Sequence, residues 1–119
     1  MGDRSKHFSW YEIACDCGCG YAMGIKKLID KLEVAREIAD IPFHINSWCR
    51  CVEHNQAVGG VAGSSHIQGL AVDIRCNTKT RRVIYDALRQ AGFTRLGIAR
   101  SFIHADVDDS KPDAVWRYQ

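Results

Sequence analysis

The sequence predicts an α+β fold in which two main helices pack on a small antiparallel sheet. Residues 25–39 and 78–90 carry apolar side chains at helical spacing. Short apolar segments at 42–47, 70–74, 93–99, 101–107 and 114–118 have the length and character of strands. The chain of 119 residues contains no internal repeat and no linker, so we expect one domain over residues 1–119.

The first main helix has the clearest local pattern. Its apolar residues fall on one face, and Pro42 ends the helix shortly beyond its last turn. That face comprises Ile25, Leu28, Ile29, Leu32, Ala35, Ile38 and Ala39. A brief helical turn is predicted before it, with Ser9 as its N-cap and Trp10, Tyr11 and Ile13 as its apolar residues.

The second main helix is predicted to start at Thr78 as its N-cap, to run to about Gln90, and to stop at Gly92. Its inward-facing residues are expected to be Val83, Ile84, Ala87 and Leu88. Residues 50–58 are compatible with a shorter third helix that stops at Gly59 and Gly60.

The composition argues against several classes of protein. The chain is 46% hydrophobic and 25% charged, as an ordinary globular domain is, and its net charge of +2 gives no electrostatic support for nucleic-acid binding. Its apolar runs are far shorter than a membrane span, and the N-terminus lacks the apolar core of a secretory signal. We therefore expect synthesis in the cytoplasm without a signal peptide, and no membrane insertion.

A histidine and an aspartate stand close together in the stretch SSHIQGLAVDI, residues 64–74. Asp73 lies inside an apolar strand, where an unpaired ionised carboxylate would cost several kcal/mol, so it needs a partner such as a cation. Gly69 and Ala71 leave room for one between His66 and Asp73. The alternative is that Asp73 caps a turn and His66 is an ordinary loop histidine.

A second histidine, His104, lies inside the later strand FIHADV. Strand alternation puts His104 and Asp106 on one face. Two histidines and one carboxylate, here His66, Asp73 and His104, make a three-ligand set that leaves a fourth zinc position for water, which is the layout of a catalytic zinc site.

These residues form a pattern that resembles the zinc D-alanyl-D-alanine carboxypeptidase family, peptidoglycan peptidases that share the Hedgehog/DD-peptidase fold. The family pattern is Ser-x-x-Arg, then Asn, then Ser-x-His-x-x-Gly-x-Ala-x-Asp, then a later His on a strand. The matching positions here are Ser47, Arg50, Asn55, Ser64, His66, Gly69, Ala71, Asp73 and His104. The likeness extends over roughly residues 8–118.

The resemblance implies a role for each of these residues. His66, Asp73 and His104 would bind zinc, and Arg50 would grip a substrate carboxylate or carbonyl oxygen, a task that suits its fork of donors. Ser47 and Ser64 would belong to the substrate-binding site, with Ser64 also orienting the loop or a ligand. Considered alone, Arg50 would more commonly form a surface salt bridge.

The chain departs from the family at the general base. Better-known members carry a Glu three residues before the last zinc-binding His, or a His two residues before it. Ser101 and Phe102 occupy those positions, and neither is a useful proton acceptor. Asp106 is the substitute candidate for the base, and its alternative role is to support a metal ligand or to start the turn that follows. A branch of the family with a His-x-Asp ending resembles this chain.

Six cysteines, at positions 15, 17, 19, 49, 51 and 76, admit three interpretations: buried thiols, a disulfide from the N-terminal loop to Cys49 or Cys51, or a structural zinc site. The resemblance suggests that the CDCGCG loop packs near the CRC segment. Trp48 and Trp116 are candidates for the walls of a peptide groove, although most such aromatics belong to the core.

The function predicted from the sequence is a zinc metallopeptidase that hydrolyses peptide bonds in peptidoglycan stem peptides or cross-links, as a D-Ala-D-Ala carboxypeptidase or an endopeptidase. The main alternative is a catalytically inactive, zinc-containing module that binds the cell wall. A non-haem iron site based on His104 and Asp106 is a weaker alternative, because no histidine follows residue 104. We expect a monomer that acts on the cell wall, either phage-encoded or exported by another route.

Overall fold

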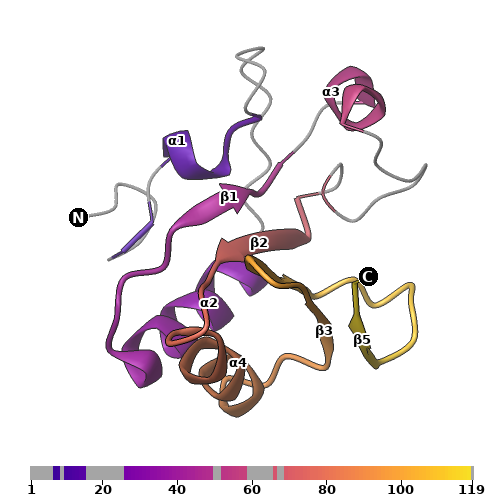
Figure 1. Cartoon of the computed structure of the whole chain (residues 1–119). Helices are drawn as coiled ribbons and strands as arrows, with labels where there is room; N and C mark the ends of the chain where they lie inside the picture. The colour runs from indigo at the N-terminus through magenta and orange to yellow at the C-terminus, as the bar shows by residue number, and fades with distance from the viewer. Residues whose placement is uncertain are drawn as a thin grey trace.

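The computed structural model describes residues 7–8, 10–15, 26–49, 52–58, 66 and 69–118. Within these residues, a five-stranded sheet has the strand order β1-β2-β4-β3-β5 (Figure 1). The strands are β1 Ile45–Ser47, β2 Ala71–Arg75, β3 Arg95–Ile98, β4 Phe102–Asp106 and β5 Ala114–Arg117. Every predicted strand is present, and β1 begins later than residue 42.

The sheet is mixed, so the expectation of a purely antiparallel sheet is wrong at one edge. Strand β5 pairs parallel to β3, whereas the other pairs are antiparallel. Both edges of β4 are already taken by β2 and β3, so β5 cannot form a hairpin with β4. It pairs instead with the outer edge of β3. Strand β5 runs opposite to β4, and because β3 also runs opposite to β4, β5 and β3 are parallel.

Helices α2 (Lys26–Ala39) and α4 (Arg81–Gln90) pack side by side on one face of the sheet (Figure 1). The core lies between them and alternate strand residues, which include the fully buried Val72, Ile74, Leu96, Ile103 and Ala105. The opposite face, which we call the site face, carries the side chains in between. Two shorter helices, α1 (Trp10–Ile13) and α3 (Val52–Ala57), complete the described part of the α+β fold.

The predicted inner faces of both main helices are confirmed at their centres and wrong at their edges. Leu28, Ile29, Leu32 and Ala35 of α2 are buried, and so are Ile84, Ala87 and Leu88 of α4. Ile38 and Val83 are exposed. Each lies roughly 100° around the helix from the centre of the buried stripe. The helical spacing of apolar residues therefore includes them, but the sheet does not cover them.

The start of α4 differs from the prediction, and its end agrees with it. Thr80, not Thr78, is the N-cap, and the Asn77 Oδ1 atom accepts hydrogen bonds from the backbone N–H groups of Lys79 and Thr80. Gly92 ends the helix with a φ of +99°, a conformation that favours glycine. The Phe93 N–H then donates to the Leu88 carbonyl, as is typical of this kind of helix stop.

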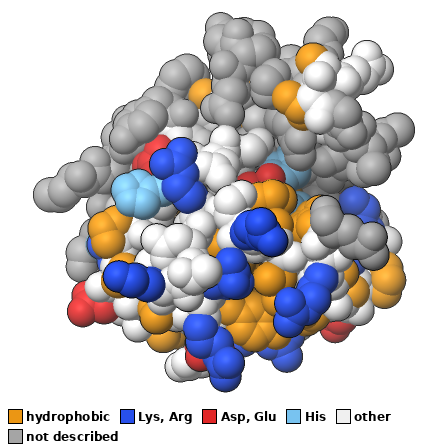
Figure 2. Space-filling view, in the orientation of Figure 1, with side chains coloured by type: hydrophobic (Ala, Val, Ile, Leu, Met, Phe, Trp, Pro, Cys, Tyr) orange, Lys and Arg blue, Asp and Glu red, His pale blue; other side chains and the backbone are white. Residues whose placement is uncertain are grey.

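The surface carries charge of both signs. Figure 2 shows Lys and Arg side chains spread over the lower half of one face, among exposed hydrophobic ones. In the described part of the chain, no helix is long and apolar enough to cross a membrane.

Candidate metal centre

One row of residues crosses the whole sheet and positions the site. Strand pairing places Ser47 opposite Asp73, Asp73 opposite His104, His104 opposite Gly97, and Gly97 opposite Trp116. Residues paired across strands share a face of the sheet, so this row lies on the site face, away from α2 and α4. Asp73 and His104 are 31 residues apart in the chain and become direct neighbours in this way.

His66 reaches the same point from the segment before β2. The Gly69 N–H donates to the His66 carbonyl at 3.1 Å, which closes a tight turn between them. Gly69 has a φ of +72°, so the turn favours glycine at this position. The short spacing between His66 and Asp73 therefore brings the histidine back over the start of β2.

The three predicted metal ligands converge. The Asp73 Oδ1 atom lies 3.3 Å from His66 Nε2 and 2.9 Å from His104 Nδ1. The three ligand atoms lie within 4.8 Å of one another, and His66 and His104 are buried. Two imidazoles and a carboxylate that surround one point are a donor set that suits zinc and leaves a further position for water or substrate. The residues therefore fit the metal that the sequence predicts.

The two histidines offer different ring nitrogens to this point. His66 Nδ1 lies 2.8 Å from the carbonyl oxygen of Trp48. A carbonyl oxygen can only accept, so Nδ1 carries a proton, and Nε2 is the nitrogen that would be left to bind a metal. In His104 the order is reversed: Nε2 lies 2.8 Å from Asp106 Oδ2, and Nδ1 faces Asp73. Each ring is held by one nitrogen so that the other points to the centre.

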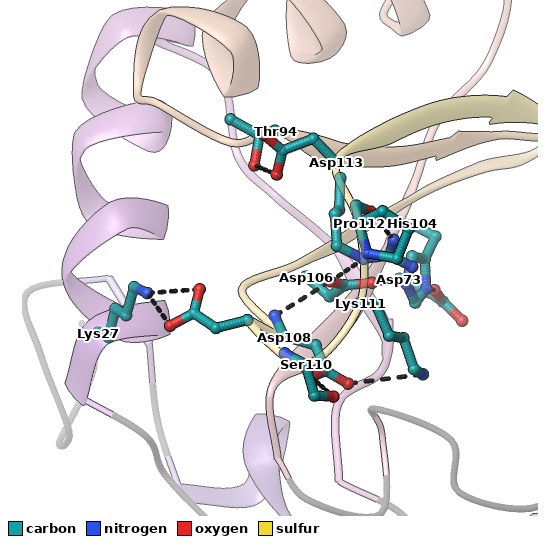
Figure 3. A network of polar contacts seen from close by, with 12 residues as sticks. Lys27, Asp73, Thr94, His104, Asp106, Asp108, Ser110, Lys111, Pro112 and Asp113 are labelled. Atoms are coloured by element: carbon teal, nitrogen blue, oxygen red, sulfur yellow. Dashed lines mark hydrogen bonds and ion pairs between the residues drawn. The ribbon is translucent and has the colours of Figure 1, made fainter.

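Asp106 is buried and has contacts on both carboxylate oxygens. Its Oδ2 contacts His104, while its Oδ1 accepts from Arg95 Nε at 2.7 Å and from the Asp108 N–H at 3.2 Å. Figure 3 shows Asp106 between His104 and the turn that contains Asp108 and Ser110. These contacts are those of the alternative role for Asp106, support of a metal ligand. Its role as a general base stays a prediction.

The electrostatics of the cluster suit a cation. Burial by itself would raise the pKa of Asp73, but hydrogen bonds with His104 and His66 outweigh it and hold that pKa well below its usual 3.8. Burial would lower the pKa of His104, whereas its bonds to Asp106 and Asp73 raise it above 6.5. The pKa of Asp106 is also lowered, because contacts with His104, the Asp108 N–H and Arg95 outweigh burial. Two carboxylates thus stay ionised beside a group that attracts a proton, and a metal cation can replace that proton.

The other predicted site residues have different outcomes. Ser47 is half-buried beside Asp73 in the row, and Asn55 is buried on α3. Arg50 and Ser64 lie outside the described residues. At the positions of the usual base, Ser101 is exposed and Phe102 begins β4.

The aromatic and cysteine predictions are also partly resolved. Trp48 is a core residue, buried against Phe8, whereas Trp116 is half-buried with its ring centroid 5.5 Å from that of His104. Cys15, Cys49 and Cys76 are buried, and the Cys49 N–H donates to the carbonyl of Ile13, the last residue of α1, at 2.9 Å. All of the CDCGCG loop except Cys15 lies outside the described residues, so its packing near the CRC segment stays a prediction. The remaining cysteines lie outside the described residues.

Two supporting groups escape sequence reasoning. Arg95 holds Asp106, and the backbone carbonyl of Trp48 holds His66. The strand register pairs Arg95 with Asp106, a relation that follows only once β3 is known to lie beside β4. A backbone carbonyl leaves no signal in the sequence at all.

The comparison with known families agrees with this geometry. The family model described as Peptidase M15 matches residues 6–107, a range that contains the whole triad. A search of curated proteins finds no match. The match covers most of the chain, and the residues within it form a centre suited to the metal of a zinc-dependent peptidase family. The chain belongs to the Peptidase M15 family.

Proposed function

We propose that this protein is a zinc metallopeptidase that hydrolyses peptide bonds in peptidoglycan stem peptides or cross-links, as a D-Ala-D-Ala carboxypeptidase or an endopeptidase. The observation that carries the proposal is the convergence of His66, Asp73 and His104 within 4.8 Å inside the range that matches Peptidase M15. The M15 family supports the peptidase activity, and the bond that is cut is the part proposed here.

Each residue of the centre has a distinct task in this proposal. Zinc, when bound, polarises the scissile carbonyl and lowers the pKa of its water. His66 Nε2, His104 Nδ1 and one Asp73 oxygen would hold the metal. The Trp48 carbonyl and Asp106 keep the two imidazole rings in the tautomers that make this ligation possible.

Substrate contacts are proposed for Ser47, Arg50 and Ser64. The pairing of Ser47 with Asp73 in the sheet motivates its assignment. Arg50 is proposed to bind a carboxylate or carbonyl oxygen of the peptide, because its planar donors match either group. The position of Ser64 two residues before His66 motivates its assignment.

The decisive experiment combines metal content with activity. We would measure zinc by elemental analysis and digestion of purified peptidoglycan for wild type, His66→Ala and Asp73→Ala. His44→Ala is the matched control, since it removes an exposed histidine that is not part of the triad. The proposal expects about one zinc beyond any held by cysteines, lost together with digestion in the two triad variants and kept in the control. Unchanged zinc in both triad variants would contradict it.

A second candidate function is an inactive, zinc-containing module that binds the cell wall. The observation that favours it is Ser101 and Phe102 at the positions of the usual base. Zinc that is bound at the triad without digestion of any peptidoglycan would select this function.

The setting of the activity is also a proposal. We propose that the protein acts as a monomer on the cell wall, without nucleic-acid or membrane partners, and that it is phage-encoded or exported.

A further inference from the structure

Three aromatic side chains form a row that starts at the metal centre. The ring centroid of Trp116 lies 5.5 Å from that of His104, and Tyr118 lies 6.3 Å from Trp116. Phe102 lies 5.2 Å from Tyr118. We call Phe102, Trp116 and Tyr118 the aromatic wall. Tyr118 is exposed and the other two are half-buried, so the wall reaches from a metal ligand to solvent.

Gly97 provides the space in which this wall lies. It is paired with both His104 and Trp116 in the row across the sheet. A Cβ atom at Gly97 would lie 2.5 Å from Trp116 Nε1 and 2.7 Å from Tyr118 Cε2, closer than side chains approach. Gly97 is not among the positive-φ glycines, so its backbone does not require glycine. The rings of Trp116 and Tyr118, which lie over Gly97, are what require a glycine at this position.

A closed cycle of contacts fixes Trp116 in this place. The Arg95 guanidinium lies 5.1 Å from the centroid of the Trp116 ring, and Arg95 Nε donates to Asp106. Asp106 contacts His104, and the His104 ring contacts Trp116. The orientation of the tryptophan is therefore linked to the group that orients a metal ligand.

We propose that the aromatic wall binds the apolar side of the peptide substrate next to the scissile bond, and that Gly97 is the positioning residue that seats the wall. The identity of the ligand rests on the proposed function. The substrate is the occupant because the wall is continuous with the metal centre through the contact between Trp116 and His104. Ligand sites commonly combine an apolar, aromatic surface with a few polar groups, and the alanine methyl groups of a stem peptide can pack against such a surface.

The kinetic test is Gly97→Ala in the zinc-loaded protein, with purified stem peptides as substrate. The added Cβ displaces the rings, so we expect KM to rise about tenfold, as for other small misfits in an apolar site, with kcat and zinc content little changed. Trp116→Ala is expected to raise KM similarly. In a background with Trp116→Ala and Tyr118→Ala, Gly97→Ala should add no further effect, because nothing remains to displace. An unchanged KM in Gly97→Ala, or an equal rise in that background, would overturn the inference.

A spectroscopic test does not depend on peptidase activity. Co²⁺ added to the metal-free protein should quench a part of the tryptophan fluorescence that Trp116→Phe lacks, because Trp116 lies beside a metal ligand. At saturating Co²⁺ we expect less quenching in Gly97→Ala; equal quenching would overturn the positioning role. If the wild type shows this quenching but neither binds nor cleaves stem peptides, the proposed function is refuted, and so is the peptide as ligand of the aromatic wall. The comparison of Co²⁺ quenching between wild type and Gly97→Ala would still decide whether Gly97 positions the wall.

Discussion

Replacing Asp106 by asparagine distinguishes the two roles that this residue can have. One carboxylate oxygen faces two donors, Arg95 Nε at 2.7 Å and the Asp108 N–H at 3.2 Å, so the asparagine oxygen must occupy that place. The amide NH₂ group then faces His104 Nε2, where Asp106 Oδ2 lies at 2.8 Å in the wild type. A donor at this place favours the tautomer of His104 that is protonated on Nδ1.

The consequence is a weaker metal site. Nδ1 is the nitrogen that faces Asp73 and the metal, and a protonated nitrogen cannot be a ligand. Loss of such a supporting group typically costs 10–100-fold in metal affinity, or about 1.4–2.7 kcal/mol. We therefore expect Asp106→Asn to bind zinc at least about tenfold more weakly than wild type. In the metal-free protein the substitution removes the charged contact with His104 but leaves Arg95 with an acceptor. We therefore expect the free energy of unfolding of the metal-free protein to fall by only about 1–3 kcal/mol.

The assay is competition for zinc between the protein and a chelating dye, with urea unfolding on the same samples. Asp109→Asn is the control, since this exposed carboxylate pairs only with Lys27 among the described residues. Zinc affinity equal to that of wild type, combined with lost peptidoglycan digestion, would refute the positioning argument. That result would instead support Asp106 as the general base.

Three further predictions concern stability. In the metal-free protein, the raised pKa of His104 contributes stability that is fully present below pH 6.5 and is lost as the pH rises through the higher pKa of the folded state. Urea unfolding with a chelator should show a decline in the free energy of unfolding over this pH range that His104→Gln lacks. A decline of equal size in both proteins would contradict this prediction. Gly92→Ala should lower the free energy of unfolding by about 1–2 kcal/mol, because alanine is strained at a φ of +99°. Space is not the cause, since the atom nearest to the new Cβ, Lys31 Nζ, is 3.6 Å away. A variant as stable as wild type in urea unfolding would show that this turn adapts. Leu32→Ala should lower the free energy of unfolding by about 2–5 kcal/mol because Leu32 is fully buried; in Ile38→Ala the loss should be much smaller, and comparable losses would mean that α2 packs with a different face.

Several features of this protein follow from local sequence alone. The periodicity of residues 25–39 and 78–90 specifies helices, and Gly92 specifies where the second one stops, because helix formation and its C-terminal stop depend on neighbouring residues. Alternation in FIHADV places His104 and Asp106 on one face, since strand geometry has a fixed period of two. Together with the family pattern, these local rules were enough to predict the metal triad.

Tertiary structure decided what depends on the order of the strands. Whether β5 runs parallel or antiparallel to its neighbour depends on which sheet edge is left, and no residue of β5 specifies that edge. Arg95, which contacts both Asp106 and Trp116, comes from β3, and β3 is known to lie beside β4 only from the folded sheet. The nitrogen that His66 presents is set by the Trp48 carbonyl, which lies on a distant segment. Asp106 sets the nitrogen of His104 from the same strand, but it is itself held by Arg95 on β3. Local sequence and the family pattern thus predicted which residues would bind a metal. Contacts between distant segments, such as those of Arg95 with Asp106 and of the Trp48 carbonyl with His66, determined how these residues are held, because only folding brings such partners together.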